Sequence, residues 1–402
     1  MLRKLLFIWI AVILALAPAG TVFAQSDAPA VFCGDLAVAD CQLLTDTRAT
    51  MEELTAGASQ FRVAGTFEDL GGALTGDFTY GQDTRFNIEP ATLARIQEVR
   101  AMDEEQLAVL MNDQAAYTEF MIDILNGLDL AQTLHLTLSP SLRESISAMI
   151  RINLPAELDV SYVLKDGVIY VNLGALAKIV PSLSFLAGWT GVNAPDAIAL
   201  FVDEGMLTPP DDAADFQTGL LLPGLAYTGA GLLGDDQRAA MFDAHMALIR
   251  DGEERINGVQ TARFLTELDL VALLADPDVQ LWLIDVFGEG LMGSLGITKE
   301  NPGGVPFVLN MMGPALFNEL EYSIVQNVGL EDTYLYRNEV DLAWDMTRLA
   351  RAFGRQVDNR VFVQFITSND NSEFNTAQVD APRGALVLPL GLIMQLMEGM
   401  NQ

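Results

Sequence analysis

The stretch LDVSYVLKDGVIYVNLG, residues 158–174, decides the fold class. Apolar and polar residues alternate over Leu158–Lys165, which is the period of a β-strand with one buried face. Asp166-Gly167 follows as a two-residue turn of the kind that β-hairpins favour, and Val168–Leu173 runs back along the first strand. The stretch therefore predicts a β-hairpin and, with it, an antiparallel sheet.

Other strand-like segments fall in clusters, and helical segments separate the clusters in blocks. A second hairpin is predicted from Phe61–Phe67 and Leu74–Gly81. The other predicted strands are Gln132–Ser139, Ser147–Leu154, Val259–Leu268, Glu321–Gly329, Thr333–Trp344, Val361–Ser368 and Asn375–Pro382. The predicted helices are Asp40–Ala56, Ala91–Leu125, Ala175–Trp189, Pro195–Glu204, Gln237–Leu248, Asp278–Leu295, Pro306–Leu320 and Ala385–Met397. This order favours an α+β fold over alternating βαβ units.

The N-terminus has the plan of a secretory signal peptide over residues 1–24. Arg3 and Lys4 form a short basic region, Leu5–Leu16 is apolar, and Val22-Phe23-Ala24 fits a cleavage site before Gln25. The apolar core is shorter than the ~20 residues that a spanning helix needs. We expect an exported protein, soluble after cleavage, with no transmembrane segment in the mature chain and one large domain over residues 25–402.

Composition excludes several classes of partner. The chain carries a formal net charge of −32, so it repels nucleic acid and anionic membrane surfaces. Half of its residues are hydrophobic, which is enough for a sizeable core under a charged surface.

Cys33 and Cys41 are the two cysteines of the chain. Outside the cytoplasm a lone cysteine pair usually bonds to itself, a metal site would need further ligands, and a redox catalyst would prefer a C-x-x-C spacing. A disulfide requires Cα atoms within ~7 Å, whereas eight residues of continuous helix span ~12 Å. We therefore expect a disulfide across a turn, with the first helix beginning at about Cys41.

Three stretches, in this serial order, resemble a known family. They are INGVQTARFLTELDL (residues 256–270), TYLYRNEVDL (residues 333–342) and FITSNDNSEFNTAQVDAP (residues 365–382). Together with the hairpin at residues 158–174 they resemble the LolA-like exported lipid-binding proteins, within them the LppX/LprAFG type of mycobacterial and related lipoproteins. The resemblance runs in patches from about Phe61 to Pro382.

The resemblance implies a curved antiparallel sheet, or half-barrel, with helices packed on its concave side. It also implies an apolar cavity between sheet and helices that holds acyl chains. The lipoproteins carry a lipidated cysteine after the signal, whereas this chain has Gln25 there, so we expect no lipid anchor. The long helical inserts near residues 91–125 and 278–320 depart from the family pattern.

Signals for catalysis are weak. His135 and His245 are the two histidines, and neither lies in a recognisable catalytic or metal-ligand motif. With 54 carboxylates, spacing alone nominates no catalytic pair. We therefore expect no enzyme, no catalytic residue, no metal and no cofactor.

The function expected from these features is non-catalytic binding or carriage of a lipid or other apolar molecule in the cell envelope or extracellular space. Two alternatives stay open, a solid-packed structural or adhesive surface module without a ligand and, more remotely, a hydrolase with an acidic site. Aromatic residues on predicted strands and the flexible methionines suit an apolar cavity. The expected lining residues are Phe78, Tyr162, Tyr170, Phe264, Tyr334, Met311 and Met312.

Overall fold

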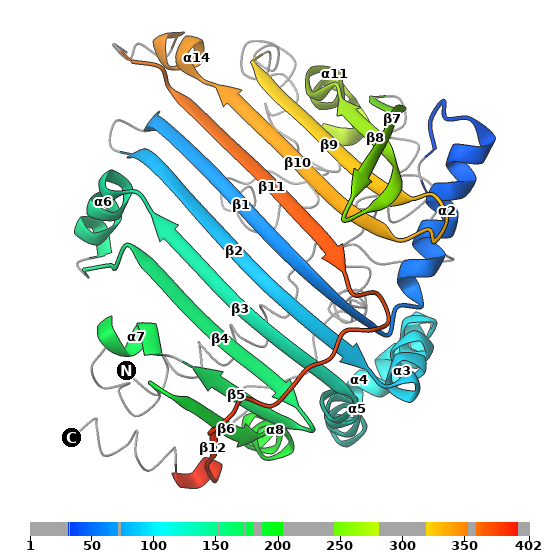
Figure 1. Cartoon of the computed structure of the whole chain (residues 1–402), viewed down its shortest axis with the longest axis vertical. Helices are drawn as coiled ribbons and strands as arrows, with labels where there is room; N and C mark the ends of the chain where they lie inside the picture. Colours follow the sequence, from blue (N-terminus) through cyan, green and yellow to red (C-terminus); the bar gives the residue numbers. More distant parts are fainter. Residues whose placement is uncertain are drawn as a thin grey trace.

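The computed structural model describes residues 31, 33–70, 74–150, 153–172, 174–179, 187–203, 245–280, 319–352 and 359–392. Its strands form one open, curved sheet in the order β12-β6-β5-β4-β3-β2-β1-β11-β10-β9-β8-β7 (Figure 1). Neighbouring strands run antiparallel except β12, which lies parallel to β6. The predicted α+β class with an antiparallel half-barrel is confirmed, and the sheet is not closed.

The sheet is made of long strands in its centre and short ones at one edge. The strands are β1 (Ala56–Leu70), β2 (Leu74–Ile88), β3 (Leu128–Leu138), β4 (Glu157–Lys165), β5 (Val168–Asn172), β6 (Trp189–Asn193), β7 (Met246–Ile256), β8 (Val259–Leu268), β9 (Leu320–Gly329), β10 (Leu335–Asp345), β11 (Phe362–Ser372) and β12 (Leu386–Val387).

Helices lie mainly beyond the strand ends, between successive strands of the chain. They are α2 (Val38–Glu52), α3 (Pro90–Arg100), α4 (Glu104–Asn112), α5 (Gln114–Gly127), α6 (Pro140–Ile150), α7 (Gly174–Ile179), α8 (Ala194–Asp203), α11 (Leu270–Ala275) and α14 (Thr347–Ala352). The predicted helical insert at residues 91–125 thus consists of three helices, α3 to α5.

The hairpin that the sequence marks most clearly is present as β4 and β5. Asp166 and Gly167 both have positive φ, 51° and 70°, which is the backbone of the turn that suits twisted strands. Lys165 pairs with Val168 across this turn. Glycine meets this geometry without a steric penalty, and aspartate is among the residues that tolerate it.

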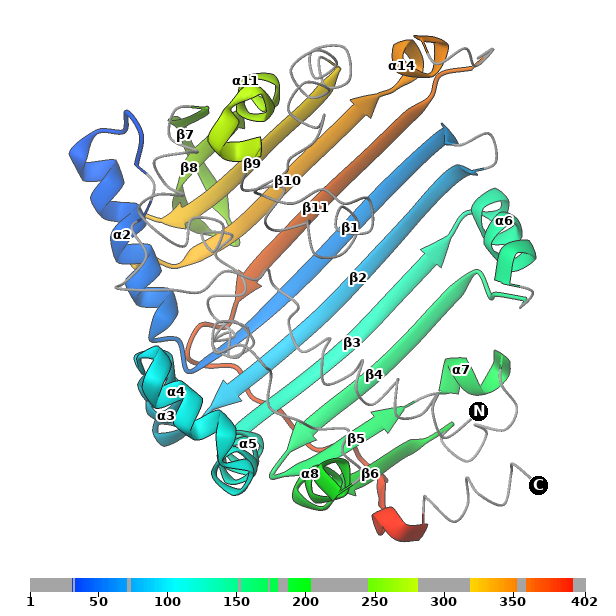
Figure 2. The same ribbon diagram turned by 180° about the vertical axis from the view of Figure 1, so that it is seen from behind.

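The centre of the sheet joins parts of the chain that are far apart in sequence. β1 pairs with β11 from Ala58↔Ser372 to Glu68↔Phe362. This pairing makes one continuous sheet from the N-terminal strands β1–β6 and the C-terminal strands β7–β11 (Figure 2).

The two faces of the sheet differ in composition. Residues paired directly across strands lie on the same face, so the register assigns Phe86, Leu130 and Leu164 to one face, which we call the apolar face. The opposite face, the polar face, carries ion pairs such as Arg62–Asp83 at 2.7 Å and Arg337–Asp370 at 2.6 Å.

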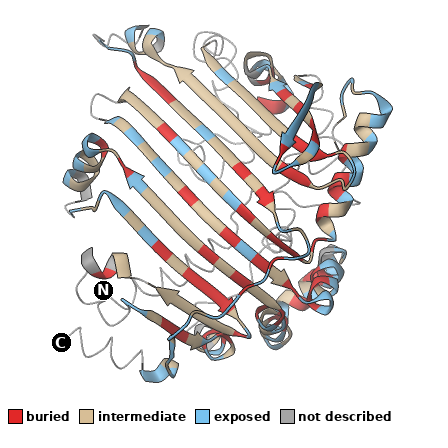
Figure 3. Ribbon diagram, in the orientation of Figure 1, coloured by how far each residue is buried: buried red, intermediate tan, exposed pale blue. Residues whose placement is uncertain are grey.

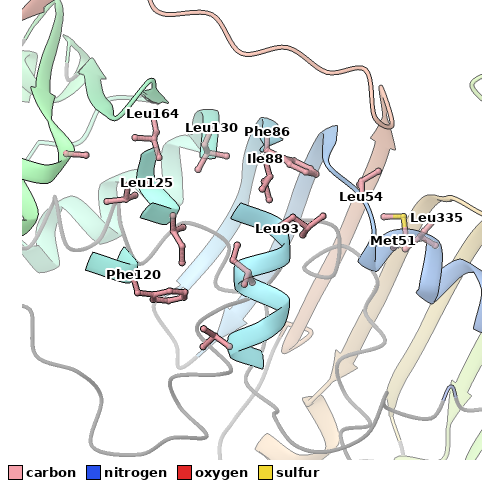
Figure 4. Packing of buried hydrophobic residues seen from close by; sticks show 14 of the residues in the cluster. Met51, Leu54, Phe86, Ile88, Leu93, Phe120, Leu125, Leu130, Leu164 and Leu335 are labelled. Carbon is pink, nitrogen blue, oxygen red and sulfur yellow. The ribbon is translucent and has the colours of Figure 1, made fainter. Parts of the chain in front are cut away.

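The hydrophobic core lies on the apolar face, at the strand ends next to α2–α5. Phe86 and Phe264 are fully buried there, in one hydrophobic cluster with side chains of α2 such as Met51 and of α3 such as Leu93. Figure 4 shows this packing from close by. Helices α5 and α8 extend it through Phe120 and through residues such as Ile198. We call this part of the apolar face the covered end.

Two predicted elements are wrong because tertiary contacts override local pattern. Residues 147–150, expected in a strand, belong to helix α6, which starts at Pro140, a favoured first residue. Leu142 and Ile146 are spaced for one helix face, and Leu142 lies against Gly76. Residues 246–248, expected in a helix, begin β7, where Met246 pairs with Leu268 of β8.

The C-terminal part also differs from the prediction. Residues 375–382 form an irregular segment, not a strand, because Glu373 and Asn375 take positive φ values of 54° and 53° and turn the chain away after β11. The segment crosses the strand ends and reaches β12, so residues 386–387 are a short strand where a helix was expected (Figure 1). Trp189, predicted as helical, begins β6.

Residues 204–244 and 281–318, which include most of the predicted insert at 278–320, lie outside the described residues.

Candidate functional site

Three phenylalanines on adjacent strands form an aromatic cluster on the apolar face, away from the covered end. The ring of Phe67 in β1 stacks on Phe78 in β2 at 5.9 Å between centroids. Phe365 in β11 meets Phe67 edge-on at 5.7 Å and Phe78 at 6.2 Å. All three side chains are only half-buried. We call Phe67, Phe78 and Phe365 the aromatic patch.

Further half-buried apolar side chains continue the patch across the sheet. By register they share its face and lie on β1, β2, β3, β9 and β10: Phe61, Val63, Tyr80, Leu134, Leu136, Tyr322, Ile324, Val340, Leu342 and Trp344. Figure 3 shows this region as mostly intermediate in burial, in contrast to the buried strand ends beside α2–α5. We call it the open end of the apolar face.

Polar side chains separate the open end from the covered end. Tyr162 donates its hydroxyl to Gln132 Oε1, and Gln132 Nε2 donates to Thr84 Oγ1 at 3.2 Å. Gln82 Nε2 also donates to Thr84 Oγ1, at 3.3 Å, and Gln82 Oε1 accepts from the Tyr80 hydroxyl at 3.0 Å. Strands β2–β4 thus contribute a satisfied hydrogen-bonded chain.

The same polar strip continues over β1, β11 and β10, where it is less well satisfied. Asn369 Nδ2 donates to Asn371 Oδ1 at 3.1 Å, and Asn371 Nδ2 donates to the Leu335 carbonyl oxygen at 3.0 Å. Ser59 pairs in register with Asn371, and Asn338 with Asn369. We call the whole strip the polar row; it consists of Gln82, Thr84, Gln132, Tyr162, Ser59, Asn338, Asn369 and Asn371.

Three oxygens of the polar row are buried without a hydrogen-bond partner among the described residues: Ser59 Oγ, Asn338 Oδ1 and Asn369 Oδ1. Ser59 is 3% exposed and Asn369 is 7% exposed. A buried acceptor without a donor costs about 1–3 kcal/mol, and native proteins keep few of them. These three oxygens lie on adjacent strands, so this stretch of the face contains several unsatisfied hydrogen-bond acceptors.

An arginine-lined cleft lies at the strand ends next to the open end. It is open, about 350 Å³ in volume, and lined by Glu319, Asp345, Thr347, Arg348, Arg351, Asn359 and Arg360. Arg348 pairs with Glu319 and Arg360 with Asp345, both at 2.8 Å. The guanidinium of Arg360 also lies 3.7 Å from the ring centroid of Phe362.

The pKa of Asp345 reflects this setting. Partial burial raises the pKa of its carboxyl, but hydrogen bonds from Thr347 and Arg360 outweigh that effect and lower it to about 2. Asp345 is therefore ionised throughout the physiological range and holds Arg360 in place.

A further open cleft, of about 510 Å³, lies between α5 and α8 and is lined by residues including Ile122 and Val202. It lies outside the face that carries the aromatic patch.

The residues predicted to line a cavity are divided among several places. Phe78 belongs to the aromatic patch, and Tyr162 belongs to the polar row and is buried. Phe264 is packed solid at the covered end, beneath the guanidinium of Arg250 at 5.5 Å.

The other predicted lining residues lie apart from the patch. Tyr334 stacks on Phe374 at 4.2 Å, next to the core at the covered end. Tyr170 pairs in register with Val163 and Gly191 and so points from the polar face, opposite Tyr162. Met311 and Met312 lie outside the described residues. An enclosed cavity stays a prediction.

Sequence analysis missed Phe67 and Phe365 as partners of Phe78, although the alternation places all three on strands. Their common face follows only from the pairing of β1 with β2 and β11. It also missed Ser59, Asn338 and Asn369, because an isolated polar residue in a strand carries no sign of which face it occupies.

Each of the two histidine side chains lies close to a carboxylate. His135, between β2 and β4 on the polar face, lies 2.7 Å from Asp159 and 3.4 Å from Asp83. His245 Nε2 lies 3.0 Å from Asp276, whose pKa this hydrogen bond lowers. In the described part of the chain, no three His, Cys, Asp or Glu side chains are grouped as metal ligands.

The disulfide predicted between Cys33 and Cys41 is present, with Cα atoms 5.3 Å apart. The chain turns back between them as expected, and helix α2 begins at Val38, three residues earlier than expected. Among the helices in the described ranges, none is both long and apolar enough to cross a bilayer.

Comparison with known proteins finds likeness in structure alone. No family model matches the sequence, and no curated protein matches it. Among solved structures, the chain is similar to lipoprotein LppX of Mycobacterium tuberculosis, with 11% identity, 85% of this chain and 100% of that chain covered, and a TM-score of 0.27.

Two further solved structures are similar over comparable lengths. LprF from Mycobacterium bovis shows 9% identity, with 85% and 95% of the two chains covered and a TM-score of 0.29. A LolA superfamily protein from Nitrosomonas europaea shows 8% identity, 84% and 94% coverage, and a TM-score of 0.15.

Proposed function

We propose that this protein is exported and binds a lipid or another apolar molecule, without catalysis, along the open end of its apolar face. The observation that carries the proposal is the aromatic patch. Phe67, Phe78 and Phe365 present half-buried rings on three adjacent strands, whereas the same face is closed by helices at the covered end.

Burial of apolar surface is the source of the binding energy in this proposal. Removing apolar surface from water contributes roughly 25 cal/mol per Å², or about 0.8 kcal/mol per methylene. An acyl chain of about twelve methylenes therefore gains roughly 10 kcal/mol before the cost of association, which is about 4–15 kcal/mol. Aromatic rings add contact area at low cost in side-chain entropy. No reactive group is needed.

Two measurements test the proposal. Native mass spectrometry of protein purified from its own host should reveal a bound apolar molecule. In addition, a fluorescent acyl probe should bind the purified protein, and the double variant Phe67→Ser/Phe365→Ser should weaken its affinity at least tenfold.

Ile366→Ser is the matched control. Ile366 is the neighbour of Phe365 in β11, but it lies on the polar face and is 39% exposed. Its replacement should leave probe affinity within twofold. Wild-type affinity in the double variant, or protein without any bound apolar molecule and without probe binding, would refute the proposal and favour a solid-packed surface module.

A further inference from the structure

We infer that the bound molecule carries hydrogen-bond donors, hydroxyl or amide N–H groups, that bond to the unpaired oxygens of Ser59, Asn338 and Asn369. The inference rests on the proposed function and narrows it, from any apolar molecule to a neutral amphiphile with a donor-bearing group.

The three oxygens form one compact group on the apolar face. Asn338 of β10 and Asn369 of β11 are directly paired, and Ser59 lies on β1, the next strand. Neighbouring strands are ~4.8 Å apart, so the group extends over roughly 10 Å.

The chemistry of these atoms selects the kind of ligand. An asparagine Oδ1 can only accept a hydrogen bond, so a partner must donate. Five buried side-chain atoms in the described residues have no partner, and three of them are these oxygens, all on this one face. A free carboxylate offers acceptors only and would leave them unpaired. A hydroxyl or an amide N–H satisfies them.

The position of the group fits an amphiphile. Asn369 and Phe365 are four residues apart on the same face of β11, about 13 Å along the strand. A molecule whose polar group lies at Asn369 can therefore extend its chain over the aromatic patch. On the other side of the polar row, the covered end is filled by side chains such as Phe86 and Met51.

The test compares three probes of equal chain length: a monoacylglycerol, the same molecule with both hydroxyls methylated, and the corresponding fatty acid. The wild-type protein should bind the monoacylglycerol at least tenfold more tightly than its methylated form. Methylation removes the donors and keeps the acceptors and the chain, so the ratio reports donation to the protein.

The variants Asn338→Leu and Asn369→Leu should abolish this ratio while leaving fatty-acid affinity within threefold. Because Asn338→Leu removes a buried unpaired acceptor, this variant should melt at an equal or higher temperature without ligand. Asn369→Leu also removes the donor to Asn371 Oδ1, so the melting comparison is made with Asn338→Leu alone. A merely structural role of these residues predicts the reverse, a lower melting temperature with the ratio kept. Ser59→Ala provides a smaller change in case a leucine variant fails to fold.

Ser368→Ala is the matched control, since Ser368 adjoins Asn369 but lies on the polar face with Arg62; it should leave the ratio unchanged. Equal wild-type affinity for the free and methylated monoacylglycerol would overturn this inference and leave the proposed function standing. Absence of binding of all three probes would overturn both.

Discussion

The covered end and the open end of the apolar face have nearly the same sequence pattern and different environments. At the covered end, Phe86 is completely buried, in one hydrophobic cluster with side chains of α2–α5. At the open end, Phe78 lies eight residues earlier on the same face of the same strand and is half-buried. Alternation therefore indicates which residues share a face, whereas only the neighbouring helices decide whether that face is core or contact surface.

The largest loss of stability is expected for a substitution at the covered end. Phe86→Ala removes a ring with no exposure and leaves a cavity, which should lower the free energy of unfolding by about 3–5 kcal/mol. Phe78→Ala, the matched change at the open end, should cost less than about 2 kcal/mol because its ring already meets a less complete shell of neighbours. Urea unfolding of both variants measures the contrast. Equal losses would show that the two ends are equally packed.

The second largest effect is expected for removal of the disulfide, which joins the N-terminal segment to helix α2 at the covered end. Replacing Cys33 and Cys41 by serine frees the segment that precedes α2, the helix over the covered end. Closing so short a loop stabilises the folded state by about 2.5 kcal/mol in the chain-entropy model. Unfolding with and without a reductant should show this loss in the wild type and no reductant effect in the double serine variant. Probe binding at the open end should stay unchanged.

The smallest expected effect concerns pH and the open end. The pKa of Asp345 is about 2 in the folded chain against an ordinary value of 3.8, so its contribution is complete above about pH 5 and is lost as pH falls through 2. We expect about 1 kcal/mol, reduced because Arg360 is half-exposed to solvent. The stability difference between wild type and Asp345→Asn should shrink progressively as pH falls from about 5 through 2. A difference that is the same at pH 5 and pH 2 contradicts the assignment.

Much of the fold was predictable from local pattern. The hairpin β4–β5 follows from alternation around Asp166-Gly167, and strand β8 has the predicted bounds, Val259–Leu268. Helix α8 begins within one residue of its prediction because Pro195 marks its first turn. These elements agree with their prediction because turn chemistry and side-chain period act over a few residues.

The candidate site was predictable only in part. Of the predicted lining residues, Phe78 and Tyr162 lie on the apolar face and Tyr170 lies on the polar face, because the face of a strand residue depends on the register set by the turn before it. The unpaired oxygens of Ser59, Asn338 and Asn369 become neighbours through the pairing of β1, β11 and β10. A strand read alone contains no information about its partner.

The sequence by itself determined the class of the fold, the strong hairpins and the disulfide, because each depends on interactions between residues close in the chain. The tertiary structure decided the rest. It placed β11 beside β1, made residues 147–150 helical and residues 246–248 a strand, and divided one apolar face into a covered end and an open end. The physical reason is that strand pairing and burial are long-range: their energy comes from surfaces that meet only after the chain has folded.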